Sequence, residues 1–188
     1  DFCLSRGLGD VYKRQSAYGQ ADNAPTVVDI PHNWDDYYGY RQLTHGNLHG
    51  TAMYEKIFML DNSQFPISDS SFGKRYFLRF EGVGTYATVT LNGKDFGRHP
   101  VGRTTLTLDV TEALKPGENR LVVKAEHPEM IADMPWVCGG CSSEWGFSEG
   151  SQPLGIFRPV VLEATDAIRI EPFGVHIWND CLLYTSPS

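Results

Sequence analysis

Residues able to do chemistry gather in one irregular stretch of the sequence, residues 127–155. Its side chains include the acids Glu144 and Glu149 and the tryptophans Trp136 and Trp145. A pair of carboxylates about 5 Å apart can act as an acid and a nucleophile, but a loop lacks the packed neighbours that hold such a pair in place. An indole face can stack on an apolar ring with less demand on geometry. We therefore predict no catalytic residue in the chain and treat these four side chains as candidates for ligand contact.

Two cysteines in the same stretch, Cys138 and Cys141, have the spacing of a metal-binding pair. A structural zinc site needs four ligands. Away from the two chain ends the sequence offers no second cysteine pair, and His127 is the only imidazole nearby. We expect free or loosely paired thiols, with a local disulfide as the alternative if the protein is exported and zinc as the last choice. No metal and no other cofactor is predicted.

The elements that must position these residues are predicted to be β-strands. From Thr51 onward, apolar and polar residues alternate with period two, which is typical of strands with one buried face. The pair Asn92-Gly93 suits a tight hairpin turn, and only residues 111–114 indicate a helical turn. Because strands with one wet face must bury the other against a second sheet, we predict an all-β fold, a jelly-roll β-sandwich. The alternation covers residues 76–81, 86–91, 105–110, 120–125 and 160–163.

Arg158 interrupts this pattern as a long cation inside an otherwise apolar strand. Such a side chain needs a carboxylate or a carbonyl as its partner. Because the guanidinium fork so often serves carboxylates, we predict a structural ion pair for Arg158, with ligand contact as the alternative.

The composition argues against two classes of partner. Sixteen Lys and Arg stand against 23 Asp and Glu, for a net charge of -7, and no basic stripe is present to neutralise phosphates. No stretch approaches the roughly 20 apolar residues of a membrane-spanning helix. We predict neither nucleic acid nor a membrane as a partner. The sequence leaves the oligomeric state open, and the compartment as well, whether periplasmic, extracellular or cytoplasmic.

Both ends of the chain look foreign to the rest. Residues 1–15, DFCLSRGLGDVYKRQ, and residues 181–188, CLLYTSPS, resemble translated sequencing-adaptor read-through, so we set them aside in predicting the fold. Genuine but loosely ordered termini are the alternative. Residues 16–165 are predicted to form the jelly-roll domain, and a fresh strand pattern over residues 166–180 to begin a second β domain.

Five phrases together resemble the sugar-binding N-terminal domain of glycoside hydrolase family 2, the family of β-galactosidases and β-glucuronidases. They are IPHNW at 30–34, GTAMYEKIF at 50–58, LRFEGVGTYATVTLNGKDFGRH at 78–99, LDVTEALKPGENRLVV at 108–123 and LGIFRPVVL at 154–162. The resemblance implies a jelly-roll domain of galactose-binding-like topology. It also implies that the full protein continues with an immunoglobulin-like sandwich and a catalytic (β/α)₈ barrel, which carries both catalytic glutamates.

The resemblance gives the irregular stretch a role. In β-galactosidase-like members, the loop just before the GIFR phrase reaches the barrel and lends polar groups to the sugar subsite. The resemblance thus implies that Glu144 and Glu149 contact sugar hydroxyls and that Trp145 or Trp136 stacks on the sugar ring. The sequence of this loop differs from the acidic sequence that is more common in the family. The alternative is therefore that these four side chains only pack within the protein or face solvent.

A second, weaker candidate patch contains Asn47 together with His45 and His49, for which ordinary surface residues are the alternative. The expected function is that of a non-catalytic N-terminal domain of a β-glycosidase, which helps to shape the active-site rim and braces the barrel. The parent protein is expected to hydrolyse the glycosidic bonds of a carbohydrate, and this fragment alone is predicted to be inactive. An autonomous carbohydrate-binding module and a purely structural β-sandwich are the alternatives.

Overall fold

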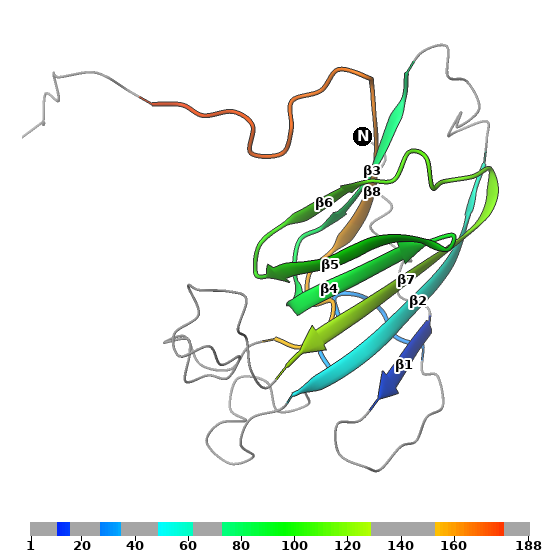
Figure 1. The fold of residues 1–188 in the computed structure, drawn as a ribbon, viewed down its shortest axis with the longest axis vertical. Coiled ribbons are helices and arrows are strands. Elements are labelled where there is room, and N and C mark those ends of the chain that lie inside the picture. The colour runs from blue at the N-terminus through cyan, green and yellow to red at the C-terminus, as the bar shows by residue number, and fades with distance from the viewer. Residues whose placement is uncertain (1–10, 16–26, 35–48, 62–72, 129–152, 179–188) are drawn as a thin grey trace, which may run out of the picture.

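The structure is a computed structural model that describes residues 11–15, 27–34, 49–61, 73–128 and 153–178. These residues form β-strands and no helix (Figure 1), so none of them offers a helix able to cross a membrane. The strands are β1 (Val11–Gln15), β2 (Gly50–Leu60), β3 (Arg75–Phe80), β4 (Val83–Leu91), β5 (Lys94–Gly102), β6 (Leu106–Asp109), β7 (Gly117–His127) and β8 (Val160–Thr165).

The strands pair antiparallel in two sheets that lie in two layers (Figure 1). A five-stranded sheet has the order β1-β2-β7-β4-β5, and a three-stranded sheet has the order β6-β3-β8. The prediction of an all-β sandwich is confirmed. Neighbours such as β2 and β7, or β3 and β8, are far apart in the sequence, so most of the pairing is long-range.

The core consists of the inward side chains of both sheets. Ala87, Val89 and Leu91 on β4 are buried, as the alternation predicted, and Tyr76, Leu78 and Phe80 on β3 face them from the other sheet. The β4–β5 hairpin turns at Asn92 (φ 53°) and Gly93 (φ 86°), which confirms the predicted tight turn. The predicted helical turn is also present, since the amides of Ala113 and Leu114 donate to the carbonyl of Val110 at 2.9 and 3.0 Å.

Residues 1–15 are set aside in predicting the fold, but part of this segment pairs with the larger sheet. Val11–Gln15 form β1, which pairs with Thr51 to Glu55 at the edge of the larger sheet. Strand pairing uses main-chain groups, so an extended segment can cover an open edge whatever its side chains. That residues 1–15 are foreign to the protein remains a prediction.

Residues 166–178 follow β8 without joining either sheet (Figure 1). The segment exposes large apolar side chains, among them Ile168 at 94% and Trp178 at 76%. The alternating apolar side chains of this segment are not buried against the described part of the chain. Such exposure is typical of a segment that packs against further protein. The second β domain over residues 166–180 stays a prediction.

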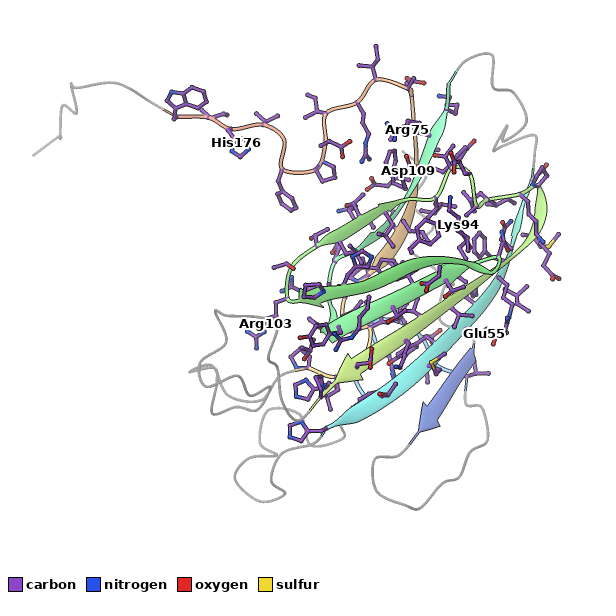
Figure 2. The ribbon with its side chains drawn as sticks, in the orientation of Figure 1. Glu55, Arg75, Lys94, Arg103, Asp109 and His176 are labelled. Carbon is purple, nitrogen blue, oxygen red and sulfur yellow. The ribbon has the colours of Figure 1, made fainter. Side chains whose placement is uncertain are left out.

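A polar corner joins the ends of β3 and β6. Asp109 accepts hydrogen bonds from the amide of Thr111 at 3.0 Å and from its hydroxyl at 2.6 Å, and it forms an ion pair with Arg75 (Figure 2). Burial alone would raise the pKa of the Asp109 carboxyl, but the hydrogen bonds from Thr111 and Arg75 outweigh it and hold the pKa below the ordinary 3.8.

This lowered pKa predicts a contribution to stability that depends on pH. The interaction stabilises the fold above the ordinary carboxyl pKa and is lost as the pH falls through the folded-state pKa. We expect Asp109→Asn to lower the free energy of unfolding at neutral pH and to have little effect at about pH 2. Urea unfolding at the two pH values measures this. The matched control is Glu112→Gln, which removes a carboxylate that pairs with Lys94 at the surface, and an equal loss at both pH values for Asp109→Asn would contradict the account.

Candidate functional site

Most of the residues singled out from the sequence lie outside the described residues. This holds for Glu144, Glu149, Trp145, Trp136 and Asn47, and also for Cys138 and Cys141. Their roles stay predictions. Arg158 is described, and so are the two family phrases that surround the site, IPHNW and LGIFR.

These two phrases are hydrogen-bonded to each other along a seam, which we define as residues 32–34 together with residues 154–156. The amide of His32 donates to the carbonyl of Ile156 at 2.7 Å, and the amide of Trp34 donates to the carbonyl of Leu154 at 3.1 Å. The side-chain oxygen of Asn33 accepts from the amide of Leu154 at 3.0 Å. Each polar residue of the first phrase thus has a structural role, which the sequence alone did not reveal.

Glycine at position 155 makes the seam possible. Its φ of 102° lies in the region that favours glycine, and a Cβ there would overlap the Tyr54 hydroxyl and lie 3.0 Å from the His32 carbonyl oxygen. The Tyr54 hydroxyl is also within hydrogen-bond distance of His32 Nδ1, at 2.9 Å. Gly84, just after the start of β4, donates its amide to the Gly155 carbonyl at 2.7 Å. The seam is therefore fixed to both β2 and β4.

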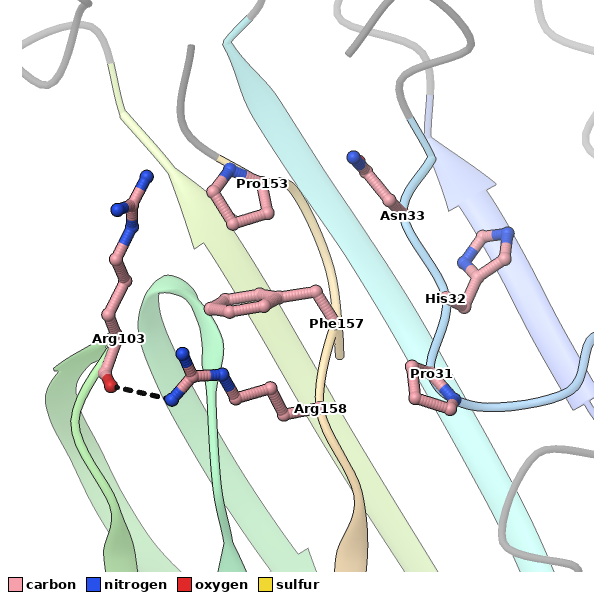
Figure 3. A pocket seen from close by; sticks show the side chains of 7 residues that line it. All are labelled: Pro31, His32, Asn33, Arg103, Pro153, Phe157 and Arg158. Atoms are coloured by element: carbon pink, nitrogen blue, oxygen red, sulfur yellow. Dashed lines mark hydrogen bonds between the residues drawn. The ribbon is translucent and has the colours of Figure 1, made fainter. Parts of the chain in front are cut away.

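A hollow of about 390 Å³ opens beside the seam (Figure 3). Arg103 and Arg158 line it on one side of the Phe157 ring, and His32 and Asn33 on the other (Figure 3). Among the described residues, the lining consists of Pro31, His32, Asn33, Arg103, Pro153, Phe157 and Arg158. These described lining residues include two guanidinium groups and no acid, in a chain whose formal net charge is -7.

Arg158 is exposed on the wall of this hollow. Its Nη1 donates to the backbone carbonyl of Arg103 at 3.3 Å, and its guanidinium carbon lies 5.8 Å from the centroid of the Phe157 ring. No carboxylate among the described residues pairs with it, so of the two expected kinds of partner the structure provides the carbonyl. Gly82 leaves room for this arrangement, because a Cβ there would lie 2.8 Å from Phe157 Cζ and 3.1 Å from Arg158 Cδ.

A second cluster lies where β2, β4 and β7 meet, and sequence reasoning missed it. His127 is 5% exposed, its Nδ1 is 2.7 Å from the Thr85 hydroxyl, and its ring stacks on that of His49 with centroids 5.4 Å apart. Thr85 has an unusual φ of 33° and shares one partner, Glu126, with Tyr86, so the strand bulges there. Stacked imidazoles do not point their nitrogens at a common point, and the described residues contain no group of three metal-ligand side chains.

Comparisons with known proteins agree on one type of domain. Residues 45–134 match a family model described as "Glycosyl hydrolase 2 galactose-binding domain-like". A β-glucuronidase of Bacteroides fragilis is 33% identical over 77% of this chain, and the β-galactosidase BoGH2A of Bacteroides ovatus is 28% identical over 85%. The crystal structure of a putative β-galactosidase from Bacteroides fragilis is 26% identical over 87% of this chain, with a TM-score of 0.62. The chain spans only 18%, 17% and 23% of these three proteins, respectively.

The geometry at Gly155 predicts that this residue cannot be replaced. We expect Gly155→Ala to lower the free energy of unfolding by about 3 kcal/mol or more, because backbone strain adds to the overlap with Tyr54 and His32. Gly93→Ala is the matched control, since Gly93 also has a positive φ (86°) but no atom within 4 Å of its Cβ position. That control is expected to cost about 1 kcal/mol. Urea unfolding compares the two variants, and equal losses would mean that the seam is not tightly packed.

Proposed function

Because the chain belongs to glycoside hydrolase family 2, as its galactose-binding-like domain, we propose that it is a non-catalytic domain of a β-glycosidase. In this role it shapes the rim of an active site that another domain houses, and it braces that domain. In this proposal the parent enzyme hydrolyses the glycosidic bond of a carbohydrate, the activity for which its β-glucuronidase and β-galactosidase relatives are named.

The observation that carries this proposal is the share of each relative that the match covers. The chain aligns over most of its own length with proteins of which it makes up about a fifth. Its described residues supply a sandwich core, a seam and a hollow lined by cations. Asp109 and Glu112, two carboxylates that line a common hollow, are ion-paired with Arg75 and Lys94. A retaining glycosidase requires an acid and a nucleophilic carboxylate about 5 Å apart that face each other across the sugar bond. The proposal therefore assigns the chemistry to the remainder of the parent protein.

The long segment that precedes LGIFR supplies the contact with substrate in this proposal. Glu144 and Glu149 bind sugar hydroxyls, and Trp145 or Trp136 stacks on the ring. The anchoring at Leu154 and Gly155 supports this assignment, because a loop whose end is fixed by backbone hydrogen bonds loses less entropy on contacting a ligand. The alternative of an autonomous carbohydrate-binding module assigns the same residues to tight binding without a partner domain.

The expected free energy of binding distinguishes the active-site rim role from an autonomous carbohydrate-binding module. One hydrogen bond to a charged group contributes about 1.5 to 3 kcal/mol, whereas even millimolar binding requires about 4 kcal/mol. Calorimetry of the 188-residue chain with galactose and lactose is therefore expected to detect no sub-millimolar binding. Sub-millimolar affinity for either neutral sugar would favour the module instead.

Activity measurements on variants of the parent enzyme distinguish the proposed contact with substrate from a purely structural role. We expect Glu149→Ala and Glu144→Ala each to lower kcat/KM by more than twofold without loss of folded protein. Glu112→Gln is the control, because this exposed acid lies in the turn after β6 and pairs with Lys94. If neither loop variant changes kcat/KM beyond the control, the domain acts as a spacer and the rim assignment is wrong.

A further inference from the structure

The hollow beside the seam combines features that point to a ligand. Arg158 is exposed at its wall and makes one hydrogen bond, to the Arg103 carbonyl, among the described residues. A guanidinium has five N–H donors in a planar fork that matches an oxyanion group in two-point contact. The described residues of the lining include two guanidinium groups and no acid, and these cations favour a negatively charged ligand.

The rest of the lining suits a ring rather than a bare ion. Phe157 is half-buried and lies between the arginine side and the His32 side of the hollow, and Pro31 and Pro153 add apolar surface (Figure 3). Its volume of about 390 Å³ lies in the range of small-molecule sites and is ample for one monosaccharide. Polar groups of His32 and Asn33 complete the wall opposite the arginines.

The surroundings hold these groups in place before any ligand arrives. The seam fixes His32 and Asn33 through the bonds to Ile156 and Leu154. The absence of a side chain at Gly82 lets Phe157 and the stem of Arg158 pack against the turn between β3 and β4. Such preorganisation reduces the entropy that binding must overcome.

We propose that this hollow is a binding site for an anionic saccharide unit, whose carboxylate or sulfate contacts the guanidinium of Arg158 beside Arg103 and whose ring packs on Phe157. The site is built from this domain's own residues and goes beyond the role at an active-site rim. Glucuronate and galactose 6-sulfate represent the two possible sources of the negative group, and glucose and galactose are their neutral counterparts.

NMR titration of the 188-residue chain tests the site. We expect a millimolar Kd for at least one of the two anionic sugars, and affinity at least about tenfold weaker for its neutral counterpart. Which of the two binds identifies the source of the negative group. If neither binds more tightly than the neutral sugars, the proposal is overturned. Acetate is the probe for charge alone, and acetate binding as tight as that of the anionic sugar would overturn the assignment to a saccharide.

Variants locate the binding. Arg158→Gln is expected to weaken binding of the anionic sugar about tenfold, and Arg103→Gln, which keeps the carbonyl that Arg158 uses, is expected to weaken it less. Arg120→Gln is the matched control, because Arg120 is exposed and paired with Glu55, which lies far from Arg103 (Figure 2). Thermal unfolding confirms that each variant is folded. Unchanged affinity in both folded pocket variants, or an equal loss in the control, would show that the sugar binds elsewhere.

Failure of this proposal and failure of the proposed function give different results. A chain that binds no anionic sugar keeps its assignment as a non-catalytic domain. Sub-millimolar binding of galactose or lactose would contradict that assignment whatever the hollow does.

Discussion

Backbone hydrogen bonds between two segments that are more than a hundred positions apart hold one end of this sandwich together. His32 and Trp34 donate to Ile156 and Leu154, and Gly84 donates to Gly155, so a single stretch joins the segment before β2 to β4. Buried main-chain groups need partners, and here each segment supplies them to the other. The close approach tolerates only glycine at position 155, because the Tyr54 hydroxyl occupies the space of a side chain.

This seam connects the fold to the site. Residue 156 is followed at once by Phe157 and Arg158, and β8 begins at Val160, so the same short stretch lines the hollow and enters the smaller sheet. Because the core on both sides is buried and close-packed, the seam cannot shift without disturbing β2, β4 or β8. The phrases IPHNW and LGIFR thus complement each other: His32 and Trp34 donate to the carbonyls of Ile156 and Leu154, and Asn33 accepts from the amide of Leu154.

Local patterns were sufficient to predict the local structure. Alternation identified the buried faces of β3, β4 and β7, and the Asn92-Gly93 pair identified a turn whose two φ angles are positive. The seam could not be predicted, because it is a pairing across long sequence separation that no periodicity encodes. Arg158 shows the same limit: its residue type indicated the need for a partner, but only the fold determined that this partner is a carbonyl. The bulge at Thr85, opposite Glu126, left no signal in the composition of its strand.

Native-state hydrogen exchange measures the strength of the seam directly, one amide at a time. If the seam is part of the cooperative core, the amides of His32, Trp34 and Gly84 exchange as slowly as the slowest amides of β4 and β7, through global unfolding. Exchange of these three amides at rates close to that of Ile168, in the exposed segment after β8, would contradict the account, since the hollow would then have no fixed wall.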